Sequence, residues 1–219
     1  MAKLVIFGAG DIGRLVHYYF TRDSQHEVVA FTVDSAYRKS GDFLGLPLVD
    51  FEKLPQRYPP GDFALFVALS YARMNKARAE KYGRARELGY TLPSYVSSRC
   101  SYLSDYPPGD NCLILEDNTV QPFVRIGSNV TLWSGNHIGH DSVIEDHCFI
   151  TSHVVVSGNC RVGAYSFIGV NATLRNSLTV GRESLIGAGA VIMGDTVERG
   201  VYVPQRATRL EKTSDQVEL

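Results

Sequence analysis

The sequence lacks several features that would each indicate a class of protein. It has no basic surplus, because 22 Lys and Arg residues stand against 23 Asp and Glu residues, which gives a formal net charge of −1 at pH 7. Non-specific nucleic-acid binding depends on neutralising many phosphates, so this balance argues against a nucleic-acid partner. No apolar run approaches the roughly 20 residues that span a bilayer. Residues 1–10 show no signal-peptide pattern. We therefore expect a cytoplasmic protein with no membrane partner.

Cysteine is scarce, and its spacing excludes two further classes. The four cysteines, Cys100, Cys112, Cys148 and Cys160, form no CxxC pair, so neither a metal-binding cysteine motif nor a disulfide scaffold is indicated. We expect them to be reduced core residues. What is present is ordinary for a soluble globular protein, with 44% hydrophobic and 21% charged residues. A length of 219 residues allows one large domain or two small ones.

The first half of the chain alternates short apolar runs with helical stretches. Strands are expected over residues 3–7, 27–33 and 63–69, with a helix from the glycine-rich turn after the first strand to about Tyr19 and a charged helix over 73–88. Strands that alternate with helices predict a small parallel α/β sheet covered by helices. The first half is therefore expected to be a small Rossmann-like α/β domain.

After Pro107-Pro108-Gly109 the sequence changes period. An apolar residue then occupies every sixth position fourteen times in a row: Ile114, Val120, Ile126, Leu132, Ile138, Ile144, Ile150, Val156, Val162, Ile168, Leu174, Val180, Ile186 and Ile192. A period of six is typical of a parallel β-helix, and neither a helix nor a single strand generates it. We expect a triangular prism with three hexads to a coil, in which residues 18 apart stack at about 4.7–4.9 Å. The expected domains are 1–98, 99–205 and a tail over 206–219.

The first turn carries a phosphate-binding pattern. Gly8-Ala9-Gly10-Asp11-Ile12-Gly13 matches GxGxxG, follows a strand and opens a helix, and Asp34 ends the second strand. This is the pattern of a dinucleotide site, but no domain for hydride transfer follows it. A helix N-terminus attracts any pyrophosphate, so we expect a phosphorylated ligand. A turn required only for tight strand–helix packing is the alternative.

Histidine is concentrated in the prism, where four of the six lie close together in sequence: His137, His140, His147 and His153. His140 is followed by Asp141, and the 18-residue stacking places Gly158 beside it on the next coil. We expect an open slot there with a free backbone N–H. An imidazole next to a carboxylate and facing such a slot suits a general base. The alternative is a solvated corner residue.

Residues 114–204 resemble the left-handed β-helix of the hexapeptide acyltransferases. The whole chain is similar to the nucleotide-sugar N-acetyltransferases that acetylate amino sugars for bacterial glycans such as the O-antigen of lipopolysaccharide. The similarity rests on the N-terminal domain that opens with Gly8-Ala9-Gly10 and on His140-Asp141. It implies acetyl-CoA as co-substrate, no metal, His140 as general base and Asp141 as the group that orients it. Two positions depart from the pattern: Asp11-Ile12 where the family often has His, and Phe149 where some members have a second active-site His.

The resemblance also implies the ligand-binding residues. Those for the nucleotide-linked amino sugar are Gly8, Gly10, Asp34, Ser70, Tyr71, Asn75 and Lys76. Those for coenzyme A are Gly158 and Ala188, with a backbone N–H near Gly158 as the oxyanion donor. Arginines available for the phosphates of coenzyme A are Arg175, Arg182, Arg199, Arg206 and Arg209.

The resemblance further implies a homotrimer with active sites between subunits. By analogy the substrate is a UDP- or dTDP-linked 4-amino-4,6-dideoxyhexose, with a GDP carrier left open. One alternative is a sugar O-acyltransferase of the sialic-acid type that uses the same His. A second is a zinc enzyme of the γ-carbonic-anhydrase type, with ligands such as His137, His140 and His153 gathered across a subunit interface. A third is a non-catalytic nucleotide-sugar-binding module.

Overall fold

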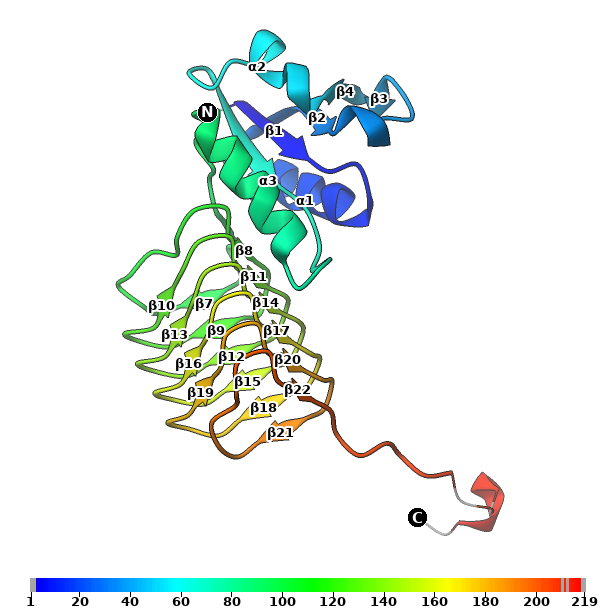
Figure 1. The fold of residues 1–219 in the computed structure, drawn as a ribbon, viewed down its shortest axis with the longest axis vertical. Coiled ribbons are helices and arrows are strands. Elements are labelled where there is room, and N and C mark those ends of the chain that lie inside the picture. The colour runs from blue at the N-terminus through cyan, green and yellow to red at the C-terminus, as the bar shows by residue number, and fades with distance from the viewer. Residues whose placement is uncertain (1–2, 210, 212, 218–219) are drawn as a thin grey trace.

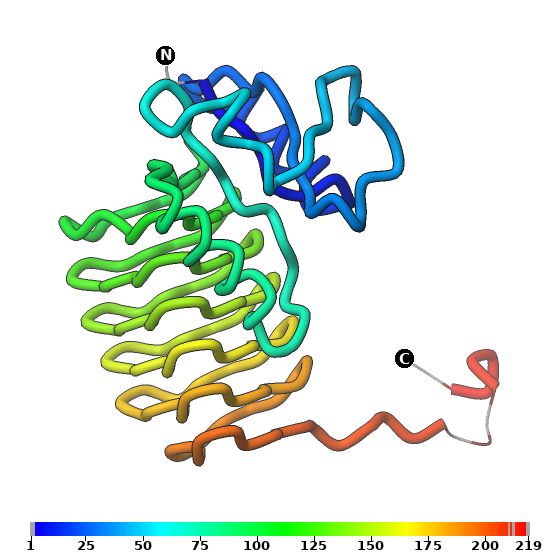
Figure 2. The backbone as a smooth tube through the Cα atoms, turned by 45° about the horizontal axis from the view of Figure 1, so that its top comes forward, coloured from blue at the N-terminus to red at the C-terminus, as the bar shows by residue number. Residues whose placement is uncertain are grey.

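A computed structural model describes residues 3–209, 211 and 213–217. The chain forms a small α/β domain followed by a long prism of stacked coils (Figure 1). The α/β domain lies beside the first coils of the prism, and the C-terminal segment leaves the last coil as an extended strand of chain (Figure 2). No helix in the described part of the chain is long and apolar enough to cross a membrane.

The α/β domain is a five-stranded sheet with helices on both faces. Its elements are β1 (Lys3–Phe7), α1 (Asp11–Arg22), β2 (Glu27–Val33), β3 (Asp42–Phe43), β4 (Leu46–Asp50), α2 (Leu54–Arg57), β5 (Phe63–Val67) and α3 (Lys76–Glu87). The strand order is β3-β4-β2-β1-β5, and all neighbours are parallel except β3 and β4. Because helices cover both faces, alternate residues of β1 enter two separate cores, which explains its continuous apolar run.

The expected strands over 3–7 and 27–33 are present with those bounds, whereas the third ends at Val67. The short strands β3 and β4 were not anticipated. The charged helix begins at Lys76 and not at Arg73, because Arg73, Met74 and Asn75 all have positive φ (55°, 52° and 64°). Three consecutive left-handed residues cannot belong to a right-handed helix, and each is strained for a residue other than glycine.

The prism is built from two-residue strands joined by tight corners. These are β6 (Tyr95–Val96), β7 (Ser101–Tyr102), β8 (Leu113–Ile114), β9 (Thr119–Val120), β10 (Arg125–Ile126), β11 (Thr131–Leu132), β12 (His137–Ile138), β13 (Val143–Ile144), β14 (Phe149–Ile150), β15 (Val155–Val156), β16 (Arg161–Val162), β17 (Phe167–Ile168), β18 (Thr173–Leu174), β19 (Thr179–Val180), β20 (Leu185–Ile186), β21 (Val191–Ile192) and β22 (Val201–Tyr202). Strand β6 already pairs with β8, so the prism begins shortly before the expected boundary at 98/99.

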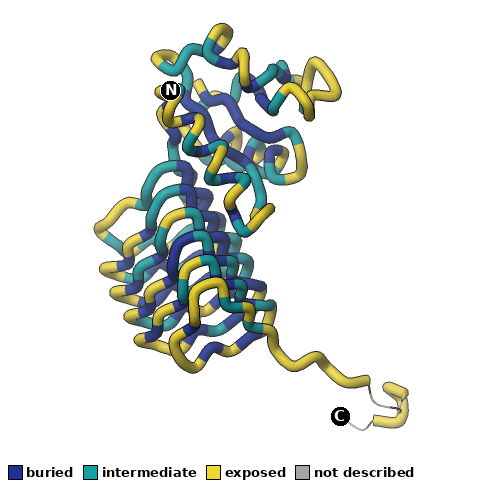
Figure 3. The backbone as a smooth tube through the Cα atoms, viewed as in Figure 1, coloured by how far each residue is buried: buried dark blue, intermediate teal, exposed yellow. Residues whose placement is uncertain are grey.

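The strands stack into three parallel sheets, one for each side of the prism. The seven-stranded sheet runs β22-β20-β17-β14-β11-β8-β6, the six-stranded sheet β21-β18-β15-β12-β9-β7 and the four-stranded sheet β10-β13-β16-β19. Partners are 18 residues apart, as His137 with Val155. All fourteen periodic apolar residues are buried, with Ile192 the most accessible at 7%. Buried residues, dark blue in Figure 3, recur along every coil of the prism. The predicted fold class, an α/β domain followed by a left-handed parallel β-helix, is confirmed.

The corners explain why the repeat needs particular polar residues. Every sixth residue from position 111 to 189 has a positive φ, and the set consists mainly of Asn, Asp, His and Gly: Asn111, Asp117, Phe123, Asn129, Gly135, Asp141, His147, His153, Asn159, Tyr165, Asn171, Ser177, Glu183 and Gly189. Asn, Asp, His and Gly tolerate the left-handed region best. Asp141 is one of these corner residues, so its presence has a structural reason that is separate from any chemistry.

Candidate active site

The loops predicted to hold a nucleotide meet at one edge of the α/β sheet. The N–H of Gly8 donates to the carbonyl of Thr32 (2.8 Å), and the N–H of Ala68 donates to the carbonyl of Phe7 (2.8 Å). The ends of β1, β2 and β5 are therefore joined side by side. Gly8 has a φ of 123°, and a Cβ on it would lie 2.6 Å from the Ala68 carbonyl oxygen. This edge is where open α/β sheets bind ligands.

The three glycines of the motif have different surroundings. Gly13 supports packing, because a Cβ there would collide with the carbonyl of Gly8. Gly10 is exposed, and a Cβ on it would meet nothing within 4 Å. Helix α1 starts directly after Gly10 without a side-chain cap. The first backbone N–H groups of α1 are therefore open to an anion.

The remaining predicted nucleotide contacts divide into two groups. Asp34 lies at this edge, where its carboxylate accepts from the ammonium of Lys81 (2.6 Å). Ser70 is half-buried, and Tyr71 is 51% exposed and packs against Phe149 with a ring-centroid distance of 5.1 Å. That these three residues contact the ligand stays a prediction.

Asn75 and Lys76 instead face the prism. Asn75 is fully buried, and its amide donates to the carbonyl of Tyr165 (2.9 Å). Its side chain is used in holding α3 against the prism, so the expectation that Asn75 binds substrate is corrected. Lys76 pairs with Glu183 of the prism (2.7 Å), and its side chain stays 46% exposed.

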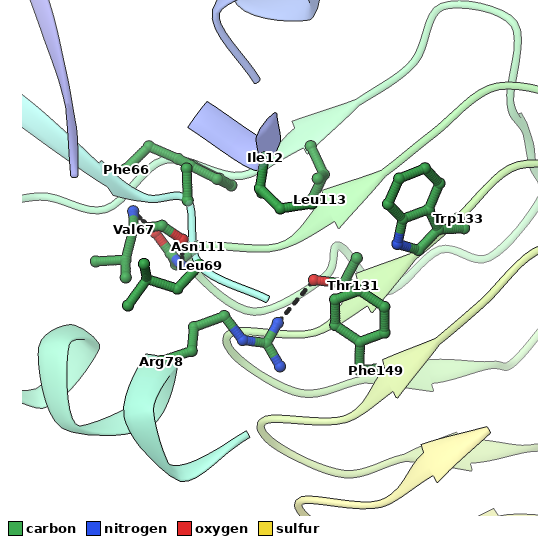
Figure 4. A pocket seen from close by; sticks show the side chains of 11 residues that line it. Ile12, Phe66, Val67, Leu69, Arg78, Asn111, Leu113, Thr131, Trp133 and Phe149 are labelled. Carbon is green, nitrogen blue, oxygen red and sulfur yellow. Dashed lines mark hydrogen bonds between the residues drawn. The ribbon is translucent and has the colours of Figure 1, made fainter. Parts of the chain in front are cut away.

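A small crevice of about 10 Å³ is lined by residues of both domains (Figure 4). Arg78 of α3 lies beside it and is 2% exposed. Its guanidinium donates to Thr131 Oγ1 (2.7 Å) and to the carbonyl of His147 (2.9 Å), and it has no ion pair within the described part of the chain. Burial lowers the pKa of Arg78 to about 10. Nothing in the sequence distinguishes Arg78 from the other cations of this charged helix, so its role could not be predicted.

Phe149 lies across the crevice from α3, 2% exposed, with the guanidinium of Arg78 over its ring. Phe149, noted above as a departure from the expected pattern, is therefore part of the domain junction in this chain.

His140 lies at the opposite side of the prism, in the corner between β12 and β13. Its Nδ1 is 2.8 Å from Asp141 Oδ2, and its backbone N–H donates to Gln121 Oε1 (2.9 Å). The two side chains are 55% and 50% exposed. A proton on Nδ1 that is shared with the carboxylate leaves the lone pair on Nε2, which is the arrangement of a general base.

Gly158 lies directly beside the ring, as the 18-residue stacking predicts. A Cβ on Gly158 would lie 2.5 Å from His140 Nε2, so the space beside this glycine is occupied by the imidazole itself and is not an open slot. The backbone N–H of Gly158 makes no hydrogen bond to any part of the chain that the structure describes. This N–H therefore remains available as an oxyanion donor.

The Gly158→Ala variant tests whether the placement of the ring matters. The added methyl group displaces the exposed imidazole, and because a misplacement of about 1 Å can cost about 10²-fold, we expect kcat to fall by roughly that factor. Gly194 is the matched control, since it lies on the same prism edge and a Cβ there meets nothing within 4 Å. Equal kcat values for Gly158→Ala and Gly194→Ala in a thiol-release assay would contradict this prediction.

One chain does not bring the predicted groups together. His140 and Gly158 lie between the six- and four-stranded sheets, whereas the α/β domain packs on the seven-stranded sheet through Tyr95 and Leu113. Ala188 follows β20 and so lies between the seven- and six-stranded sheets. Gly158 and Ala188 thus lie at opposite edges of the six-stranded sheet.

The candidate arginines are similarly dispersed. Arg175 follows β18 and lies on the same edge as Gly158, whereas Arg182 and Arg199 surround Glu183 near α3. Arg206 and Arg209 are exposed in the C-terminal segment. Of these five arginines, Arg175 is therefore the one that lies on the prism edge of His140.

The histidines considered as zinc ligands are also separated. His137 is on β12, and His153 lies over Gly135 at the corner between the seven- and six-stranded sheets. Within the described residues, no group of three or more His, Cys, Asp or Glu side chains could hold a metal ion. The zinc alternative would have to draw its ligands from more than one subunit.

Comparison with known proteins agrees with the repeat. The family described as bacterial transferase hexapeptide (six repeats) matches residues 123–158. A curated relative from Bartonella bacilliformis, an acyl-[acyl-carrier-protein]–UDP-N-acetylglucosamine O-acyltransferase, is 30% identical over 103 residues, which are 36% of this chain and 38% of that protein. The chain thus spans less than half the length of this curated relative.

Solved structures match over nearly the whole chain. The acetyltransferase domain of PglB from Neisseria gonorrhoeae is 27% identical with a TM-score of 0.80, covering 91% of this chain and 95% of that one. The same domain in complex with acetyl coenzyme A is 26% identical with a TM-score of 0.78, covering 90% and 93%. PerB from Caulobacter crescentus in complex with CoA and GDP-perosamine shares the fold at 23% identity, with a TM-score of 0.80 and coverage of 92% and 93%.

The chain is therefore a hexapeptide-repeat protein of the left-handed β-helix acyltransferase superfamily. Within that superfamily it has the two-domain architecture of the acetyltransferases just described, with a small α/β domain ahead of the prism.

Proposed function

We propose that the protein transfers an acetyl group from acetyl-CoA to the amine of a nucleotide-linked amino sugar. The single observation that carries the proposal is the His140–Asp141 pair, which is exposed at a prism corner with Nε2 free to accept a proton. Two further observations support it. The uncapped start of α1 is suited to a pyrophosphate. The related PglB domain, of the same two-domain architecture, is described in complex with acetyl coenzyme A.

The geometry suggests direct transfer. The sugar nitrogen attacks the thioester carbonyl carbon, and His140 Nε2 accepts a proton from that nitrogen as the new C–N bond forms. The oxyanion of the tetrahedral intermediate accepts a hydrogen bond from the N–H of Gly158. Collapse breaks the C–S bond, and the leaving thiolate takes the proton from the imidazolium. Asp141 stabilises that imidazolium through Nδ1.

We propose a homotrimer with active sites between subunits, and the separation of the parts supports this proposal. His140 and the nucleotide-binding loops lie on different sides of one chain, so the complete site would combine His140 of one subunit with the α/β domain of the next. Light scattering should give three times the chain mass.

Complementation gives a sharper test of the shared site. Chains with His140→Ala and chains with Gly10→Asp, whose carboxylate would repel the pyrophosphate, should each be inactive alone. Mixed trimers should recover activity. No recovery from the mixed trimers would place each site within one chain.

The substrate proposed in detail is a 4-amino-4,6-dideoxyhexose on UDP or dTDP, used in bacterial glycan synthesis such as that of the O-antigen in the cytoplasm. The deciding experiment measures thiol release from acetyl-CoA against a panel of amino sugars carried on UDP, dTDP and GDP. Release with at least one amino sugar is expected. Thiol release with none of them would remove the proposal.

An O-acyltransferase is the second candidate, because the curated relative at 30% identity is named as one. The product separates the two candidates. An O-acyl sugar loses its acyl group to hydroxylamine, whereas an amide does not, and we expect the product to resist.

The Asp141→Asn variant tests the role of the carboxylate. Asparagine tolerates the positive φ of 58° at this corner, so the fold should be unchanged. The imidazolium loses its charged partner but the base remains, so kcat should fall by roughly 10-fold, less than for removal of the imidazole. Steady-state kinetics of Asp141→Asn and His140→Ala check this. An equal loss for both would give Asp141 a larger role than orientation.

A further inference from the structure

A ladder of buried side chains connects the prism to the predicted nucleotide-binding loop. Asn111, Asn129 and His147 stack 18 residues apart at the corner between the four- and seven-stranded sheets. The Asn111 amide donates to Asn129 Oδ1 (2.8 Å), and Asn129 Nδ2 lies 2.9 Å from His147 Nδ1. At the top of the ladder, Asn111 Oδ1 accepts from the backbone N–H of Val67 (2.8 Å), the last residue of β5 (Figure 4).

The polarity of this ladder is fixed at its top. A backbone N–H can only donate, so the amide oxygen of Asn111 must face Val67 and its NH₂ must face Asn129. The same reasoning makes the NH₂ of Asn129 the donor to His147. His147 Nδ1 must therefore carry a lone pair, with the proton on Nε2. Asn111 and Asn129 are 2% and 0% exposed, so bulk water cannot replace the bonds that join Val67, Asn111 and Asn129, whereas His147 at the other end is half-buried.

Both ends of the loop between β5 and α3 are attached to the same corner. The ladder holds Val67, where the loop starts, and Arg78 of α3 donates to the backbone carbonyl of His147 (2.9 Å). The loop between them carries Ser70 and Tyr71. A displacement of His147 would therefore act on both ends of this loop, through the ladder at Val67 and through the carbonyl that Arg78 contacts.

We propose that Asn111, Asn129 and His147 position the nucleotide-binding loop, and that the loop is held only while His147 is neutral. Protonation of Nδ1 replaces an acceptor by a donor, so two N–H groups then face each other and the ladder opens next to Asn129. The assignment of the loop to a nucleotide rests on the proposed function, whereas the coupling of His147 to the loop does not.

The surroundings of His147 favour the neutral form. Burial is the main cause that lowers the pKa of His147 below its ordinary 6.5. The groups that face it are the carboxylates of Asp110 and Asp146, the guanidiniums of Arg78 and Arg182, and the rings of Tyr82 and Tyr165 on either side. Because the pKa of His147 is lower in the folded chain, the unfolded chain takes up the proton at higher pH. Neutral His147 therefore makes its full contribution to the free energy of unfolding above about pH 6.5. It is lost as the pH falls from there to the folded pKa.

Amide hydrogen exchange between pH 5 and 8 tests the coupling directly. In the wild-type protein, protection of Val67 and of the loop should fall roughly 10-fold at the acid end after correction for intrinsic exchange, because loss of the Asn129–His147 bond leaves the Asn129–Asn111 pair that holds Val67 without its anchor, at a cost of about one hydrogen bond. The His147→Asn variant places an oxygen where Nδ1 lies, cannot titrate and tolerates the positive φ of 65°. Its protection should stay constant, with amides of β2 as the internal reference.

For a second variant we expect the pH dependence of loop protection to be reversed. In Asn129→Asp, a carboxylate can accept from Asn111 and needs a protonated His147, so loop protection should rise as the pH falls. The same pH dependence in wild type and His147→Asn would overturn the proposal, as would an unchanged sign in a folded Asn129→Asp.

Nucleotide affinity separates this inference from the proposed function. Calorimetric Kd values for UDP, dTDP and GDP should weaken at acid pH in the wild type but not in His147→Asn. If the exchange pattern is as expected but no nucleotide binds, the ladder still positions the loop. In that case the loop is not a nucleotide-binding loop, and the proposed function is overturned.

Discussion

The His140→Ala variant should retain its fold and lose roughly 10²–10⁴-fold in kcat, the usual contribution of a general base. The ring is 55% exposed and its one hydrogen bond within the described chain is to Asp141. Truncation therefore removes proton transfer and little packing. Steady-state thiol release gives kcat, and an unchanged melting temperature shows that the fold is intact.

His153→Ala is the matched control for this variant. His153 is also an exposed prism-corner residue with a positive φ (57°), and its ring likewise lies over a glycine. We expect its kcat to stay within a few-fold of wild type. The zinc alternative predicts equal losses at both positions. A near-wild-type kcat for His140→Ala would remove the mechanism.

The Arg78→Ala variant should lower the free energy of unfolding by about 3–5 kcal/mol. The side chain is 2% exposed, and its removal leaves a cavity between the domains. It also leaves Thr131 Oγ1, Asn75 Oδ1 and the carbonyl of His147 without the donor that each now has. Buried acceptors that lose their partner carry the full cost of desolvation.

Chemical denaturation at a fixed protein concentration measures this loss. Arg84→Ala is the matched control, because Arg84 lies on the same helix but its side chain is 59% exposed and pairs only with Glu87. That substitution should change stability by about 0.5 kcal/mol or less. Equal effects of the two substitutions would mean that the buried guanidinium does not hold the domains together.

The repeat made most of the fold predictable. A fixed period of six places each apolar side chain on the prism axis and each left-handed residue at a corner, so that a sequence offset of 18 is also a spatial contact. The same rule correctly placed Gly158 beside His140. The adjacency of His140 and Asp141 could be inferred from their order, whereas their roles in catalysis stay predictions.

Elements without a repeat were harder to predict. The helix expected over 73–88 begins at Lys76 because Asn75 is held in a left-handed conformation by contacts with Tyr165, which is 90 residues away in sequence. Strand β3 has only two residues, and β4 contains Pro47, which weakens the signal of a strand. The same distant contacts turned Asn75 from an expected ligand contact into a buried residue of the domain junction.

The sequence by itself determined the prism, its axis and the identity of the exposed histidine–aspartate corner, because these follow from relations between residues at fixed short offsets. Only the tertiary structure decided that Arg78 is a buried cation and that His140 lies across the prism from the predicted nucleotide-binding loops. It also decided that hydrogen bonds through Asn111 and Asn129 connect the backbone N–H of Val67 to His147. Such facts depend on how two separately folded domains meet. No local period of the chain encodes that meeting, because its contacts join residues far apart in sequence, as Val67 with Asn111 (44 positions) and Asn75 with Tyr165 (90 positions).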